Sequence, residues 1–163
     1  MECLSSAPKA LGSSDDPSAG NPVRVLLVDG DARVRSALRH LIALEGDLVV
    51  VADAGSVDGA LVAAERTSPA VALVELLLPD AASGLALVRV LATRPDCAIV
   101  AMSLRGGLEE AAVGAGAVLF VDKGNGSVLD AVRTASRRHR DQDRDGDQDR
   151  DRDGDQGEGD RVI

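Results

Sequence analysis

Aromatic residues are almost missing from this chain. Its 163 residues include one Phe, no Trp and no Tyr, although 45% of them are apolar. A chain of this length has enough material for one domain with a substantial core, and that core must consist of Val, Leu, Ile and Ala. The stacked aromatic platforms on which proteins bind single-stranded nucleic acids are therefore excluded.

Cysteine and long apolar runs are also scarce. The two cysteines, Cys3 and Cys97, do not make a disulfide framework, and we expect a reducing, cytoplasmic location. Residues 1–22 contain no sustained apolar stretch and do not resemble a signal peptide. No apolar run approaches the length that spans a membrane, so we expect no membrane association.

The chain has no excess of basic charge, because its net charge is −9. Residues 1–22 contribute −2, and residues 23–140 carry 14 acidic and 13 basic side chains. Residues 141–163 carry 10 acidic and 4 basic side chains, so most of the acidity lies in this last segment. Since the central region is nearly neutral, direct binding to DNA phosphates is not expected.

Strand and helix patterns alternate from residue 23 to about residue 138. Five short apolar runs predict buried strands, and helical spacing follows each of them: VRVLLV, DLVVVADA, VALVE, CAIVAMS and AVLFV. This alternation predicts an α/β fold, a single doubly wound, five-stranded parallel sheet flanked by about five helices. The leader, residues 1–22, and the acidic segment, residues 139–163, are expected to be disordered.

Four polar residues lie at or just past the ends of predicted strands: Asp29, Glu75, Ser103 and Lys123. Ligands of such sheets bind at the carboxyl ends of the strands, so we expect these residues to form a site. Glu75 is the least expected of them, because the run VALVELLLPD is otherwise apolar up to Pro79. A buried carboxylate costs several kcal/mol unless it is paired, coordinated or protonated.

The order and spacing of VRVLLVDGD, VALVELLLPD, AIVAMS and GAVLFVDKG resemble the receiver domain of bacterial two-component response regulators. The resemblance covers residues 23 to about 138 and implies the flavodoxin-like receiver fold. It also implies a site in which two adjacent acids after the first strand help to bind Mg²⁺. An aspartate that ends the third strand then accepts a phosphoryl group from a histidine kinase.

Two positions depart from this pattern. Asp29 matches the first acid, but Gly30 holds the second position and Asp31 comes one residue later; Glu75 holds the phosphoacceptor position. Glutamate's extra methylene moves the nucleophile by about 1 Å or more, which can cost on the order of a hundredfold in rate. Any Mg²⁺ held by Asp29 and Glu75 would be bound weakly, and no cofactor is required.

The resemblance assigns roles to three further residues. Ser103 and Phe120 take the places of the switch residues, and Lys123 takes the place of the lysine after the fifth strand. A charge-assisted bond between Lys123 and Glu75 would satisfy both groups without a metal and fix the switch in one state. The plainer alternatives are a purely stabilising carboxylate at Glu75, turn and cap residues at Asp29 and Asp31, and a core residue at Phe120.

The predicted function is that of an atypical, stand-alone receiver that acts through protein contacts and is not an enzyme. The expected partner is a histidine kinase or a transcription regulator, because residues 139–163 are too few for a helix-turn-helix output domain. One alternative is a working phosphoacceptor that uses Glu75 or a neighbouring acid. An enzyme on the same fold is disfavoured, because VDGDARV is not a glycine-rich phosphate loop.

A weaker alternative is a calcium-responsive module in the acidic segment. Its near-repeats have the D-x-D-x-D-G order of a calcium loop. The candidate positions are Asp149, Asp151, Asp153, Gly154 and Asp160. Because Gln156 stands where an apolar residue is usual, a low-complexity acidic segment is the favoured interpretation.

Overall fold

The computed structural model describes residues 21–124 and 127–150. In this part of the chain five strands alternate with five helices, as the sequence predicts. The elements are β1 (Val23–Val28), α1 (Ala32–Ala43), β2 (Leu48–Ala54), α2 (Val57–Thr67), β3 (Val71–Glu75), α3 (Ala81–Ala92), β4 (Ala98–Ser103), α4 (Glu109–Gly114), β5 (Leu119–Asp122) and α5 (Val128–Arg150).

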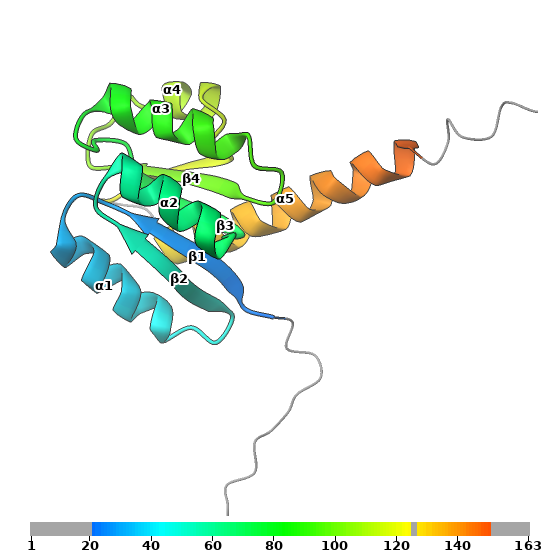
Figure 1. Ribbon diagram of the computed structural model, residues 1–163, viewed down its shortest axis with the longest axis horizontal. Coiled ribbons are helices and arrows are strands. Elements are labelled where there is room, and N and C mark those ends of the chain that lie inside the picture. The colour runs from blue at the N-terminus through cyan, green and yellow to red at the C-terminus, as the bar shows by residue number, and fades with distance from the viewer. Residues whose placement is uncertain (1–20, 125–126, 151–163) are drawn as a thin grey trace, which may run out of the picture.

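The strands form one parallel sheet in the order β2-β1-β3-β4-β5 (Figure 1). The chain moves outward from β1 to β2 and then returns to the other side of β1 to form β3. The direction of winding therefore reverses between β1 and β3. In sheets of this kind, the crevice outside the carboxyl ends of those two strands is where ligands bind.

Successive residues of β1 point to opposite faces of the sheet and join two separate apolar cores. Leu26 and Val28 belong to the core under α2, α3 and α4. Val25 and Leu27 belong to the core under α1 and α5. Because both faces of the inner strands are covered, their sequences are apolar at almost every position. The doubly wound architecture is thus confirmed.

Side chains at the strand ends cap the helices that follow. Asp31 accepts a hydrogen bond from the Arg33 backbone N–H at the start of α1 (2.8 Å), and Ser56 accepts one from Gly59 N–H at the start of α2 (3.2 Å). Asp80 accepts one from Ser83 N–H at the start of α3, which lowers the pKa of the Asp80 carboxyl. These caps fix short strand-to-helix loops at the carboxyl edge of the sheet.

The last helix is longer than the sequence predicted. It continues to Arg150, and Figure 1 shows it projecting well past the sheet. The helical pattern in the sequence ends near residue 138, and the helix itself runs beyond that point. The domain boundary expected there stays a prediction. Acidic residues and arginines recur three positions apart in this stretch, a spacing that supports a helix.

Parts of the sequence predictions lie outside the described residues. These are residues 1–20 of the leader and residues 151–163, which include every candidate calcium position except Asp149. None of the helices that the structure describes is both long enough and apolar enough to cross a membrane.

Candidate functional site: a charge cluster at the carboxyl edge

Three charged residues from different strand ends meet at the carboxyl edge of the sheet. Asp29 directly follows β1, Glu75 is the last residue of β3, and Lys123 directly follows β5. The Lys123 backbone N–H donates to the Ser103 carbonyl (3.0 Å), which continues the pairing of β5 with β4 by one residue. Lys123 is therefore anchored beside the end of β4, from where its side chain reaches β3 and β1.

The Lys123 ammonium is shared by two carboxylates. Its Nζ lies 2.5 Å from Asp29 Oδ2 and also forms an ion pair with Glu75 Oε2. The predicted pair between Glu75 and Lys123 is thus present, and Asp29 is its third member. Asp29 is 3% exposed, Glu75 is 6% exposed and the Lys123 side chain is 13% exposed, so the cluster is largely shielded from water.

The remaining carboxylate oxygens accept hydrogen bonds from the backbone. Asp29 Oδ1 accepts from the Asp31 N–H (2.8 Å), and Glu75 Oε1 accepts from the Leu77 N–H (2.9 Å). All four oxygens of the two buried carboxylates therefore have a donor. Because their desolvation is compensated in this way, Glu75 is tolerated at the end of an apolar strand.

The pKa of Lys123 reflects its two partners. Burial by itself lowers the pKa, but the hydrogen bonds to Asp29 and Glu75 outweigh burial and leave it above the ordinary value. The ammonium is therefore charged throughout the physiological range.

Asp29 and Glu75 are the two carboxylates at this edge that could contribute to a magnesium site. Gly30 supplies no carboxylate, and Asp31 caps α1 and pairs with Arg33 (3.1 Å) at the surface. Within the described residues no three His, Cys, Asp or Glu side chains are grouped so that they could hold a metal ion. One oxygen of Asp29 and one of Glu75 pair with the Lys123 ammonium, which supplies the positive charge at this site.

The two predicted switch residues lie on the strands next to the cluster. Ser103 ends β4 and is fully buried, and its Oγ accepts a hydrogen bond from the Arg105 N–H (3.1 Å). Phe120 lies on β5, half-buried, and packs against the core under α2, α3 and α4. Their roles as switches stay predictions, since these contacts are those of a single arrangement.

One residue at the site had no signal in the sequence. The Arg35 guanidinium, on α1, donates to the Asp29 backbone carbonyl (2.7 Å) and pairs with Asp53 on β2 (3.3 Å). It therefore holds the loop that carries Asp29 and Gly30. An arginine on an amphipathic helix is ordinarily a surface residue, and only the packing of α1 on the sheet brings it to this loop.

Comparison with known proteins places this geometry in a family. Residues 25–132 match the model of the response regulator receiver domain. No match was found among curated proteins.

Solved structures with the same fold cover most of the chain. The response regulator domain of Thermotoga maritima CheB is 24% identical, with a TM-score of 0.63 over 72% of this chain and 98% of that chain. A LuxR-family two-component response regulator from Aurantimonas sp. SI85-9A1 is 26% identical, with a TM-score of 0.57 over 61% and 73% of the two chains. CheY of Borrelia burgdorferi, solved in a CheX-CheY-BeF3-Mg complex, is 17% identical, with a TM-score of 0.63 over 73% and 92%. The chain belongs to the family of response regulator receiver domains of two-component signalling.

Proposed function

We propose that this receiver domain signals through protein contacts and without normal phosphorylation of the position that Glu75 holds. The observation that carries the proposal is the Lys123 ammonium, which pairs with both Asp29 and Glu75. The site thereby contains, in its ground state, the charge neutralisation that a metal ion supplies during phosphoryl transfer.

Phosphoryl transfer to a carboxylate depends on the position of the nucleophile and on neutralisation of the transferred group. Here each Glu75 oxygen is engaged, one by the Leu77 N–H and one by Lys123. Gly30 leaves the neighbouring ligand position without a carboxylate. Both changes oppose phosphorylation, and they arise at separate places in the fold, the end of β3 and the loop after β1.

The same cluster supports a fixed state of the switch residues. Lys123 is joined to the end of β4 through the Ser103 carbonyl, so the ion pairs restrain that strand end as well. In this proposal Ser103 and Phe120 keep one arrangement, and the surface next to them presents one constant shape. The output then depends on which partner binds that surface.

Receiver domains interact with histidine kinases or effector domains, and we propose a partner of this kind. The Borrelia burgdorferi CheY, which was solved with CheX, is a receiver bound to a separate protein. That complex also contains BeF3 and Mg, whereas this chain lacks a matching carboxylate at Gly30. Contact with a protein without the metal is the form of signalling that this site supports.

The test is phosphorylation with acetyl phosphate and Mg²⁺, followed by intact-mass spectrometry. We expect no acyl-phosphate adduct on the wild-type chain. The double variant Glu75→Asp with Gly30→Asp is expected to become labelled. A Cβ at Gly30 would lie 3.5 Å from Leu78 Cδ1, an ordinary contact, so the first carbon of the new side chain causes no clash.

A matched control carries the same two changes away from the site. Glu65 is exposed on α2, and a Cβ at Gly46 meets nothing within 4 Å, so Glu65→Asp with Gly46→Asp should remain unlabelled. A stoichiometric, hydroxylamine-labile adduct at Glu75 of the wild-type chain would refute the proposal and favour a working phosphoacceptor.

A further inference from the structure

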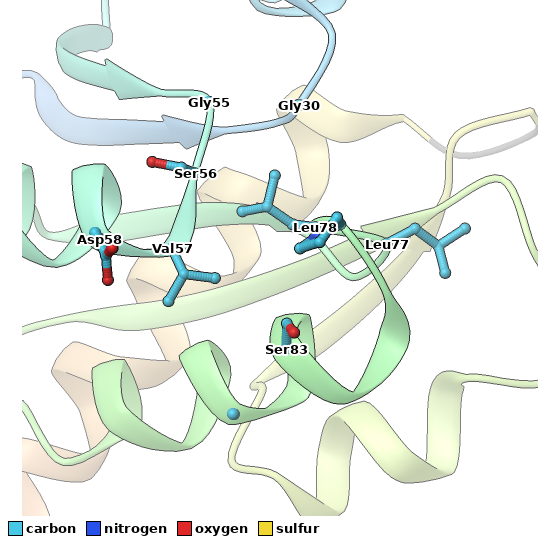
Figure 2. A pocket seen from close by; sticks show the side chains of 10 residues that line it. Gly30, Gly55, Ser56, Val57, Asp58, Leu77, Leu78 and Ser83 are labelled. Carbon is cyan, nitrogen blue, oxygen red and sulfur yellow. The ribbon is translucent and has the colours of Figure 1, made fainter.

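A pocket of about 610 Å³ lies beside the charge cluster, between the loop that leads into α2 and the loop that leads into α3. Figure 2 shows Val57 and Asp58 on the α2 side, Ser83 on the α3 side and Leu78 between them. Its volume is within the range of roughly 300–1,000 Å³ that is typical of sites for small molecules.

The walls of this pocket are mostly apolar. Val57, Leu78 and Pro79 line it, together with Ala86 from the second turn of α3. Leu78 is 2% exposed and is held in the core, so this wall does not depend on a mobile surface side chain. An apolar ligand body of matching shape would displace water from these surfaces, which is favourable.

Gly30 helps to keep the pocket open. It lines the side next to the charge cluster, and a side chain there would extend toward Leu78, whose Cδ1 is 3.5 Å from the position of a Cβ. The residue that removes a metal ligand from the site thus also leaves space in the neighbouring pocket. Both effects come from the same missing carboxylate.

The charges around the pocket select the class of ligand. Asp58, exposed in the first turn of α2, is the only ionisable residue among the described residues that line it. The charge cluster of Asp29, Glu75 and Lys123 is not part of the lining. An anionic ligand would therefore find no basic side chain in the wall, whereas a cationic group would find one carboxylate.

We propose that this pocket binds a small organic amine. Its apolar body lies against Val57, Leu78 and Pro79, and its ammonium group pairs with Asp58. The ligand would also contact Gly30, the neighbour of Asp29 in the chain, and Leu77, whose backbone N–H donates a hydrogen bond to Glu75. Such a ligand would give a receiver an input other than phosphorylation, and its binding is measured independently of the proposed function.

The test is a titration of the ¹⁵N-labelled protein, followed by two-dimensional NMR, with three probes that share one ring system. Tryptamine is cationic, indole is neutral and indole-3-acetate is anionic. We expect tryptamine to shift the amides of Gly30, Gly55, Val57 and Leu77 with a Kd on the order of 1 mM. Indole should bind about two- to fivefold more weakly, because an exposed carboxylate adds only modestly to affinity. Indole-3-acetate should bind most weakly.

Two variants separate the parts of the site. Asp58→Asn should remove the preference for tryptamine over indole and leave indole binding unchanged. Ala86→Leu fills the pocket and should weaken all three probes by at least about tenfold. The matched controls are Glu109→Gln, which removes an exposed acid from the first turn of α4, and Ala82→Leu, which enlarges an exposed residue of α3 outside the lining.

The proposal is overturned if the three probes bind equally well or not at all. It is also overturned if the shifted amides lie elsewhere in the sheet, or if the two control variants weaken binding as much as Asp58→Asn and Ala86→Leu. Because Asp58 is exposed, its substitution tests the site without threatening the fold.

Discussion

Lys123 pairs with Glu75 across the carboxyl end of β4, although the two residues are separated in the sheet by that whole strand. The reach is possible because Lys123 begins from a backbone hydrogen bond to Ser103, at the end of β4 itself. The same ammonium also meets Asp29, so one cation compensates two buried acids. Both acids therefore depend on Lys123, whereas Lys123 keeps one partner when either acid is removed.

This sharing predicts unequal effects of removing its members. Lys123→Met leaves both carboxylates buried without a counter-charge and should lower the free energy of unfolding by about 3–5 kcal/mol. Glu75→Gln leaves Lys123 paired with Asp29 and should cost less, about 1–3 kcal/mol. Urea unfolding of the two single variants and the double variant gives the coupling energy, which we expect to exceed 0.5 kcal/mol by the usual behaviour of contacting pairs.

A second ion pair provides the control for this cycle. Arg94 and Glu65 approach to 3.7 Å at the surface, where the Glu65 side chain is 73% exposed. The cycle of Arg94→Met and Glu65→Gln should give a coupling energy of at most about 0.5 kcal/mol. Equal coupling energies in the two cycles would show that burial does not strengthen the interaction between Lys123 and Glu75.

The free energy of unfolding should fall in alkaline solution, and ionisation of Cys97 should cause the part of this decline that begins at the lowest pH. Burial raises the pKa of this thiol from 9.0 to about 11. Between those values the unfolded chain has released the proton and the folded chain keeps it. The free energy of unfolding should therefore fall by about 1.4 kcal/mol per pH unit, to a total of about 3 kcal/mol. Urea unfolding of wild type and Cys97→Ala across this range should show a shallower decline for the variant.

The remaining alkaline decline should belong to Lys123. Its pKa is raised in the folded state above the ordinary 10.5. The stabilising contribution is therefore complete below pH 10.5 and is lost as the pH rises through the folded-state pKa. The chain has no Tyr, so tyrosine ionisation does not contribute in this range. An identical pH profile for wild type and Cys97→Ala would contradict the assignment of the first decline.

Gly84 should be intolerant of any side chain. A Cβ at this position of α3 would lie 1.9 Å from the Leu76 carbonyl oxygen, which belongs to the backbone and has no rotamer to change. Gly84→Ala should therefore lower the free energy of unfolding by about 2 kcal/mol or more. Gly114→Ala is the matched control in α4, where a Cβ meets nothing within 4 Å. That change should be neutral or stabilising by up to about 1 kcal/mol, and comparable losses at the two glycines would disprove the steric account.

The architecture of the described domain could be predicted from the pattern of residues alone. Apolar runs of strand length alternate with stretches of helical spacing. An inner strand that is buried on both faces of a sheet is apolar at nearly every position, so these runs predict a sheet covered by helices on both sides. The pattern also placed Asp29, Glu75, Ser103 and Lys123 at one edge, since the ends of parallel strands meet there. The cost of burying a charge required a partner for Glu75, and the resemblance to receiver domains pointed to Lys123 as that partner.

Only the tertiary structure decided how the charges are shared. Asp29 and Asp31 are two residues apart, yet one is buried against Lys123 and the other caps α1 at the surface. The pocket beside the site joins Val57, at the start of α2, with Leu78, from the loop before α3. Local pattern also misplaced the end of α5, since the polar sequence after residue 138 shows no apolar periodicity. Such contacts depend on side-chain directions and loop paths across the whole sheet, and no local stretch of sequence encodes them.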